Sequence, residues 1–221
     1  MAEHHHHEPF WRKYIFSVDH KVIGLQYAIT AMVFLLFGFC LMLIMRWNLA
    51  YPSEVVPIVG KLLSEEGMLT PDGYNSFGAM HGTIMVFLGV VPLAVGGFGN
   101  YVLPIQIGAP DMAFPKLNMA SYWSFFVGGV LMLSSFFMPQ GTASSGWTMY
   151  APLSIIAETG ETIWLFGMVF LITSSLLGSV NFIATVIQLR TKGLTWMRLP
   201  FFVWTQFVTA FLLLLAFPPL E

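Results

Sequence analysis

Long apolar runs separated by short polar stretches make up the chain from residue 22 onward. A bilayer core about 30 Å thick requires roughly 20 apolar residues in a helix. Each run is too long and too uniformly apolar for a helix in a soluble core. The pattern therefore predicts an all-α protein, a polytopic membrane helix bundle with five transmembrane helices. The spans are expected at residues 22–46, 74–103, 117–138, 161–189 and 199–221.

The basic residues indicate how the bundle is oriented. They gather before the first span and in alternate loops, at Arg12, Lys13, Lys21, Lys116, Arg190, Lys192 and Arg198. The other loops contain only Lys61, and Arg46 lies at a span end. Because Lys and Arg are enriched in cytoplasmic loops, we expect a cytoplasmic N-terminus. Residues 1–21 are then a cytoplasmic segment and residues 22–221 the transmembrane bundle.

Composition supports a membrane protein and excludes several other classes. Hydrophobic residues make up 57% of the chain and charged residues 9%, against about 25% charged residues in soluble domains. A net charge of -2 and the lack of a basic block argue against binding of nucleic acid. The single cysteine, Cys40, excludes an internal disulfide and is expected to be a packing residue. His4 to His7 are expected to form a disordered tail, either a tag or native sequence.

One histidine lies inside a predicted span. His81 is about seven residues into the second span, roughly 10 Å below its boundary at 1.5 Å per residue. Ionisable residues at this depth indicate a functional site, and neutral imidazole is a common ligand of haem iron. Gly78 and Gly82 leave room for a flat group beside the ring. A hydrogen bond to a neighbouring helix or a water pocket would explain His81 equally well.

A second group of polar residues is expected at the cytoplasmic ends of the spans. Carboxylate, amide and hydroxyl groups at matching depth can hold a file of water molecules that conducts protons. The alternative is that Asp111 caps the start of the third span and that the amides connect loops. The group comprises Asp111, Asn100, Asn118, Ser121, Tyr27, Ser174, Ser175 and Asn181.

Three further residues are expected on the same side of the membrane as His81. Arg46 closes the first span, where its side chain could extend to the interface or neutralise a substituent on a haem. Trp147 and Tyr150 follow the third span. They could anchor the chain at the interface or pack on the edge of a cofactor.

Six sequence strings in order resemble the N-terminal part of subunit I of haem–copper oxidases. The resemblance covers nearly the whole chain past Phe10. The sequence pattern is similar to that of the A-type, cytochrome c oxidase-like branch. The strings are "DHKVIGLQY", "HGTIMVF", "GGFGNYVLPIQIGAPDMAFPKLN", "GWTMYAPLS", "SSLLGSVNF" and "FVWTQFVTAFLLLLAFPPLE". As an expectation, the chain corresponds to helices I to V of that subunit.

The resemblance implies a role for each candidate residue. His81 would be one axial ligand of the low-spin haem iron, with Arg46, Trp147 and Tyr150 beside that haem. Asp111 would lie at the mouth of the D-type proton channel. The channel would continue through Asn100, Asn118, Ser121, Tyr27, Ser174, Ser175 and Asn181.

Departures from the family pattern concern the channel and the electron donor. The family often has Asn-Asn where this chain has Asn118-Met119, and a hydroxyl or small residue near Leu171, so hydration of the channel could differ. Quinol-using members carry an Arg and an Asp in the positions of Phe37 and Leu41. The apolar pair here favours cytochrome c as the donor.

The resemblance also implies what the chain needs from elsewhere. The low-spin haem is expected to be haem a. The opposite axial ligand, the ligands of the high-spin haem and copper, and the rest of subunit I are expected beyond Glu221, where we expect the sequence to be cut. The implied partners are a copper-bearing subunit II, subunit III, cytochrome c and membrane lipid, without nucleic acid. A bacterial cell inner membrane is the expected location.

These patterns predict the N-terminal part of the catalytic subunit of a terminal oxidase. That enzyme would be a cytochrome-c oxidase that reduces oxygen to water and translocates protons. Two alternatives remain open: a quinol oxidase of the same superfamily, and a non-catalytic short or split paralogue that acts as a scaffold.

Overall fold

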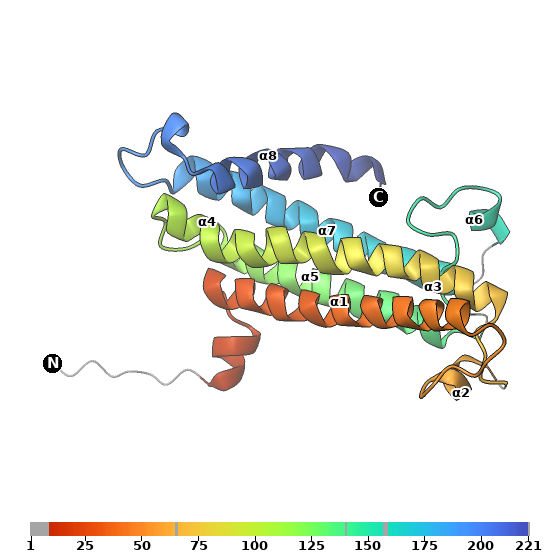
Figure 1. The fold of residues 1–221 in the computed structure, drawn as a ribbon. Helices are drawn as coiled ribbons and strands as arrows, with labels where there is room; N and C mark the ends of the chain where they lie inside the picture. The colour runs from red at the N-terminus through yellow and green to blue at the C-terminus, as the bar shows by residue number, and fades with distance from the viewer. Residues whose placement is uncertain (1–8, 65, 140, 157–158, 221) are drawn as a thin grey trace. The chain divides into compact units, whose positions relative to one another are not determined.

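The computed structural model describes residues 9–64, 66–139, 141–156 and 159–220. The expectations for His4 to His7 and for the end of the chain at Glu221 lie outside these residues. Within them every regular element is helical and there is no strand, which confirms the all-α class. The longer helices in Figure 1 are α1 (His20–Ala50), α3 (Pro71–Thr83), α4 (Asn100–Ile107), α5 (Pro115–Ser134), α7 (Thr159–Gln188) and α8 (Phe201–Ala216).

Several short elements complete the described chain. The π-helical segments are η1 (Trp11–Ile15), η2 (Ile84–Val90) and η3 (Pro92–Gly99). The α-helical turns are α2 (Gly60–Leu63) and α6 (Leu153–Ile156), and the 3₁₀ turns are η4 (Ser135–Phe137), η5 (Trp196–Arg198) and η6 (Pro218–Leu220).

Four helical segments are long and apolar enough to cross a membrane: His20–Ala50, Pro71–Ile107, Pro115–Phe137 and Thr159–Gln188. Each begins and ends within a few residues of a predicted span. The fifth predicted span, 199–221, is a shorter apolar helix, α8, of 16 residues. It follows Pro200 and ends before Pro218. Proline lacks the N–H that a helix interior requires, and it disfavours helical geometry in the residue before it.

The segment Pro71–Ile107 changes its hydrogen-bond pattern near its middle. Pro92 cannot donate a backbone hydrogen bond, so the regular ladder is interrupted there. One residue earlier, the Val91 N–H donates to the carbonyl of Val86, five residues back. The chain thus runs through η2 and η3 as π-helix between α3 and α4, a pattern frequent at functional sites. The apolar pattern predicts one continuous span and contains no signal for this change.

Gly108 ends α4 in the left-handed conformation, with φ 71°. Its N–H donates to Ile105 O, and the N–H of Ala109 donates to Pro104 O at 2.9 Å, so carbonyls left open at the helix end are satisfied. The N–H of Thr191 donates to Ile107 O at 3.0 Å. The end of α4 is therefore bonded to the loop that follows α7.

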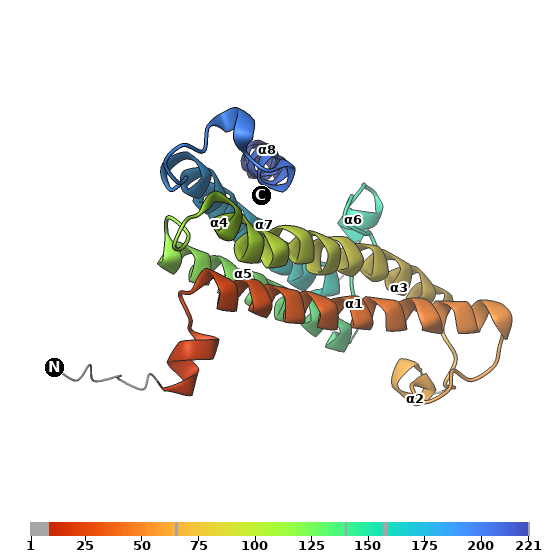
Figure 2. The ribbon, with the colours of Figure 1, turned by 60° about the vertical axis from the view of Figure 1, so that its left-hand side comes forward.

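The described chain divides into two compact units, and several helices contribute residues to both. Unit one comprises Met1–Ala28, Val95–Trp123 and Ser174–Glu221. Its apolar core joins α4, the later part of α7 and α8, and Figures 1 and 2 show these elements in blue and green. The core residues are Leu103, Ile107, Ala109, Met112, Phe182, Val186, Leu199, Val203 and Ala210.

Unit two comprises Ile29–Ala94 and Ser124–Thr173. In this unit α5 and α7 approach closely at two glycines: a Cβ on Gly128 would lie 2.9 Å from the carbonyl oxygen of Gly167, and the reverse distance is also 2.9 Å. Small residues at such contacts allow the close helix packing typical of membrane proteins. Cys40 is exposed on α1, so the prediction that it is a packing residue is wrong within the described chain.

Candidate functional site

His81 lies on α3 in unit two and is half-buried. Its Nδ1 is 2.9 Å from the carbonyl oxygen of Gly38 on α1. Because a carbonyl can only accept, we assign the proton of the neutral imidazole to Nδ1, which leaves Nε2 with a lone pair. No hydrogen-bond partner of Nε2 occurs in the described part of the chain. A histidine ligand that donates its other ring N–H to a backbone carbonyl is the usual arrangement in metal sites.

The surroundings of His81 have room for a planar group. A Cβ added to Gly82 would meet no heavy atom within 4 Å, whereas one added to Gly78 would lie only 3.3 Å from Cε of Met45, so the open space is at Gly82. Gly38 itself is closely packed, since a Cβ there would lie 2.8 Å from Sδ of Met85. An oriented imidazole, an available nitrogen and open space beside it fit a haem ligand.

The aromatic and basic residues expected beside a haem are mainly exposed. The ring of Trp147 lies 5.9 Å from that of Phe87, six residues after His81. Trp147 is 59% and Tyr150 77% exposed, and Arg46 is also exposed. Trp147 therefore packs on η2, the element that follows His81. The described contacts of Arg46 and Tyr150 do not include His81.

A hydroxyl cluster of Tyr27, Ser121 and Ser174 connects three helices inside unit one. The Tyr27 hydroxyl lies 2.6 Å from Oγ of Ser121 and 3.2 Å from Oγ of Ser174. Each serine also donates to the other's backbone carbonyl, at 3.1 Å and 2.7 Å. All three side chains are buried. Ser121 and Ser174, which lie 94 and 147 positions after Tyr27 in the sequence, therefore form one hydrogen-bonded group with it.

Three buried asparagines of unit one retain polar atoms without a partner among the described residues. Asn100, Asn118 and Asn181 are at most 2% exposed. The unpaired atoms are Oδ1 of Asn100 and Nδ2 of the other two. Leaving such an atom unsatisfied costs about 1–3 kcal/mol, and ordered water is the usual partner at buried polar sites. The amides predicted for a proton path are thus suited to holding water.

Asp111 lies in the loop between α4 and α5 and is half-buried. Its Oδ1 accepts a hydrogen bond from the Met112 N–H at 2.7 Å, before α5 begins. Farther along the loop, Phe114 N–H donates to Oδ1 of Asn181 at 2.9 Å. Ser175 is half-buried on α7. The loop that contains Asp111 is therefore bonded to Asn181 through Phe114, while no described hydrogen bond joins Asp111 or Ser175 to Asn181.

Two residues that sequence reasoning did not single out stabilise this region. His20 is 3% exposed, and its Nδ1 lies 2.9 Å from the carbonyl oxygen of Asn100. Thr185 accepts a hydrogen bond from Ala113 N–H at 2.9 Å through its side-chain oxygen. Thr185 lies one helical turn after Asn181 on α7, a spacing that places both side chains on one face. That spacing is the only sequence signal that could have identified Thr185; none was available for His20.

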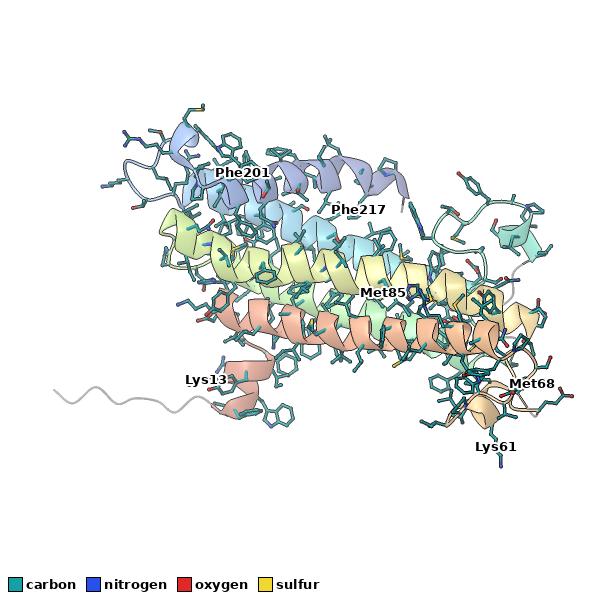
Figure 3. All side chains as sticks on the ribbon, viewed as in Figure 1. Lys13, Lys61, Met68, Met85, Phe201 and Phe217 are labelled. Atoms are coloured by element: carbon teal, nitrogen blue, oxygen red, sulfur yellow. The ribbon has the colours of Figure 1, made fainter. Side chains whose placement is uncertain are left out.

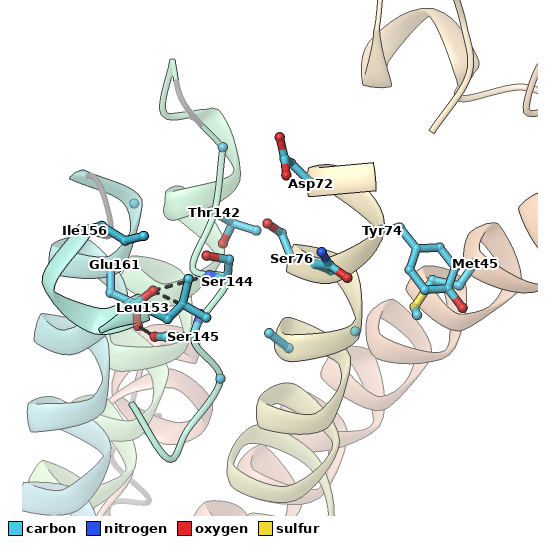
Figure 4. A pocket seen from close by; sticks show the side chains of 16 residues that line it. Met45, Asp72, Tyr74, Ser76, Thr142, Ser144, Ser145, Leu153, Ile156 and Glu161 are labelled. Carbon is cyan, nitrogen blue, oxygen red and sulfur yellow. Dashed lines mark hydrogen bonds between the residues drawn. The ribbon is translucent and has the colours of Figure 1, made fainter. Parts of the chain in front are cut away.

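A buried carboxylate in unit two holds the loop that carries Trp147. Glu161, at the start of α7, is 6% exposed and accepts hydrogen bonds from Ser144 N–H at 3.3 Å and from Ser145 N–H and Oγ. Figure 4 shows these bonds at one wall of a cavity of about 680 Å³, with Asp72 and Ser76 on the α3 side. We call residues 144–150 the serine loop. Glu161 therefore positions the serine loop.

We expect Glu161→Ala to loosen the serine loop. The change removes the acceptor of two backbone N–H groups, so the free energy of unfolding should fall by about 1–3 kcal/mol. Amide hydrogen exchange in residues 144–150 of the assembled protein should become faster. Glu161→Gln keeps one acceptor oxygen and should stay closer to the unchanged protein. Equal exchange in Glu161→Ala and the unchanged protein would show that the carboxylate does not hold the loop.

Comparison with known proteins identifies the family. The family model "Cytochrome C and Quinol oxidase polypeptide I" matches residues 22–221. Cytochrome c oxidase subunit 1 of Thermostichus vulcanus is 44% identical over 218 residues, covering 97% of this chain and 37% of the relative. The subunit 1 of Synechocystis sp. is 40% identical over 212 residues, covering 95% of this chain and 36% of the relative.

A third relative is the alternative cytochrome c oxidase subunit 1 of Bradyrhizobium diazoefficiens, 38% identical over 226 residues, with 99% of this chain and 36% of the relative covered. The chain thus spans a little over a third of the length of these curated relatives. Its helical fold, with four segments able to cross a membrane, agrees with the family match. The chain is a multi-pass membrane protein that belongs to the subunit I family of haem–copper oxidases.

Proposed function

We propose that this chain is the N-terminal part of the catalytic subunit of a terminal oxidase and that His81 is one axial ligand of its low-spin haem. The observation that carries the proposal is the contact of His81 Nδ1 with Gly38 O at 2.9 Å, which fixes the ring and leaves Nε2 available. The haem, expected to be haem a, would supply reversible one-electron transfer. The chain's own part is to orient the imidazole and to leave space beside Gly82.

The proposal assigns the rest of the oxygen-reducing site to other parts of the enzyme. The opposite axial ligand, the high-spin haem and the copper would be held by the remaining part of subunit I. A copper-bearing subunit II would deliver electrons and subunit III would complete the complex. Arg46, Trp147 and Tyr150 would contact the edge of the low-spin haem. Of these, Trp147 has the strongest support, because its ring packs on Phe87.

The proton path is proposed to begin at Asp111 and to continue through the buried amides and the hydroxyl cluster. The unpaired amide atoms of Asn100, Asn118 and Asn181 would be satisfied by water. A hydroxyl can accept one proton while it donates another, so the Tyr27 and Ser121 oxygens at 2.6 Å can pass a proton between them. Ser174 is bonded to the same tyrosine, and Ser175 is assigned to the path by its neighbouring position on α7.

Orientation and domain organisation are part of the same proposal. Residues 1–21 would form a cytoplasmic segment and residues 22–221 one transmembrane bundle within the larger subunit I fold, in a bacterial cell inner membrane. The support is the distribution of Lys and Arg: seven of the nine lie before α1 or in its first turn, and in alternate loops or at the helix ends next to them. A non-catalytic scaffold would have no need of an oriented His81 or of paired polar groups inside the helices.

Cytochrome c is the proposed electron donor. Where quinol-using members carry an Arg and an Asp, this chain has Phe37, with its ring 5.5 Å from that of Phe136, and Leu41, which is 4% exposed. A charged side chain at such an apolar site is costly unless it is paired. These positions therefore favour a donor that acts through subunit II.

We expect the complete oxidase to turn over with reduced cytochrome c at least about tenfold faster than with a quinol at saturating concentration, a difference of about 1.4 kcal/mol in barrier. Oxygen consumption of the purified complex with each donor measures this. Faster turnover with quinol would identify a quinol oxidase of the same family. Turnover with neither donor, from a complex that lacks low-spin haem, would favour the scaffold hypothesis.

A further inference from the structure

The first described residues form an aromatic and basic segment on the surface of unit one. We call residues 9–18 the N-terminal segment. Phe10 is 64%, Trp11 66% and Phe16 53% exposed, and Arg12 and Lys13 are exposed between them. Figure 3 labels Lys13 on this segment. Aromatic rings next to basic side chains are typical of residues at the membrane–water interface.

The N-terminal segment has a defined position in unit one. The side-chain amide of Gln26 on α1 donates to the carbonyls of Tyr14 at 2.7 Å and Ile15 at 2.9 Å. The ring of Phe16 stacks on that of Trp123 of α5, with centroids 5.1 Å apart and planes at 24°. The segment is therefore attached to two of the membrane-crossing helices near its own end.

An apolar cavity of about 630 Å³ opens where the N-terminal segment meets the start of α5. We call it the lipid pocket. Its lining consists of Val18, Ala113, Phe114, Pro115, Lys116 and Leu117, so a lysine is its single charged side chain. Val18 is 45% and Phe114 46% exposed, and Lys116 is exposed. The cavity is shallow and largely open to the surroundings, and it joins an apolar wall to one positive charge.

The charge around the lipid pocket favours an anion. Residues 9–21 and 109–117 contain four basic side chains and two acidic ones. Both carboxylates already accept backbone hydrogen bonds, Asp19 from Lys21 N–H at 2.7 Å and Asp111 from Met112 N–H at 2.7 Å. No ion pair between these basic groups and either carboxylate is described, and Arg12, Lys13 and Lys116 are exposed. A segment with this balance is attracted to anionic lipid headgroups.

We propose that the lipid pocket binds an anionic phospholipid, with an acyl chain against Val18, Phe114 and Leu117 and the phosphate near Lys116, Arg12 and Lys13. A lipid fits because α1 begins at His20 and α5 at Pro115, so the pocket lies at the ends of two membrane-crossing helices, where headgroup and acyl regions meet. The proposal uses no residue of the haem-ligand site and does not depend on the proposed enzymatic function.

Photocrosslinking in the complete oxidase complex tests this site. The complex is reconstituted in nanodiscs that contain phosphatidylglycerol with a diazirine on one acyl chain, and labelled peptides are mapped by mass spectrometry. We expect labelling within residues 9–18 and 113–117. Lys116→Gln should reduce it about fivefold, the effect typical of one basic residue near an anionic surface. A phosphatidylcholine probe with the same diazirine should label these peptides several-fold less.

Lys61→Gln is the matched control, because Lys61 is an exposed lysine on α2, outside unit one. It should leave labelling of the pocket peptides unchanged. A second variant, Arg12→Gln with Lys13→Gln, should weaken labelling without altering the pocket wall. Equal labelling by both lipid probes, no effect of Lys116→Gln, or crosslinks from these residues to another polypeptide would overturn the proposal. An unchanged haem spectrum in each variant confirms that the complex is folded.

Discussion

We expect replacement of His81 by phenylalanine to remove the low-spin haem signal from the assembled oxidase, because of the geometry of this residue. Phenylalanine keeps a flat ring of similar size but has neither the Nδ1 proton that bonds Gly38 O nor the lone pair that would bind iron. Occupancy of the low-spin haem should fall at least about tenfold, since one axial bond is lost outright and a tenfold change requires only about 1.4 kcal/mol. Reduced-minus-oxidised spectra and the ratio of haem to protein measure this.

His20 offers a matched control for His81 in the same chain. It is also held by a Nδ1 contact of 2.9 Å to a backbone carbonyl, that of Asn100, but it is only 3% exposed. His20→Phe should cost about 1–3 kcal/mol of stability through the orphaned carbonyl and should keep the low-spin haem. If His81→Phe retains the haem signal, or if His20→Phe loses it equally, His81 is not the ligand.

This pair of histidines also shows where sequence reasoning reaches its limit. The depth of His81 within an apolar run and its flanking glycines make it a candidate from the sequence. The partner of its Nδ1 lies 43 residues away and is a backbone carbonyl, which has no residue-specific signature. The close packing at Gly38 emerges only from the structure, in which a Cβ at this position would lie 2.8 Å from Sδ of the Met85 side chain.

Helix positions follow from the sequence more readily than contacts between helices. The run of apolar residues is set by the thickness of the bilayer, so four spans agree with prediction within a few residues. The hydroxyl cluster depends instead on the rotation of three helices about their own axes. Tyr27, Ser121 and Ser174 share only a compatible depth in the sequence, whereas the distance of 2.6 Å between two of their oxygens is a property of packing. The shortened α8 reflects Pro218, whose local effect the apolar count does not include.

Asp111→Asn is the second change with a large expected effect, a fall in proton uptake and oxygen turnover of about tenfold, or about 1.4 kcal/mol in barrier. Asparagine retains an oxygen that can accept the Met112 N–H, now at 2.7 Å from the carboxylate, so the loop should keep its conformation. What is lost is the negative charge and the ability to bind and release a proton at the proposed entrance. Proton uptake by the complete oxidase in vesicles, followed with a pH-sensitive dye after oxygen mixing, measures the effect directly.

Asp19→Asn is the control that separates proton entry at Asp111 from a general effect of removing a negative charge. Asp19 also accepts a backbone hydrogen bond at 2.7 Å, from Lys21, and lies in the same unit, but it is not part of the proposed path. Its substitution should leave both rates within a factor of about two, the size expected for an exposed charge. Equal slowing by the two substitutions would mean that surface charge, not entry at Asp111, controls uptake. Slowing by Asp111→Asn alone would place the entrance in the loop that Asn181 and Thr185 bond to α7, because Asp111 lies in that loop, one residue before Met112 and two before Ala113.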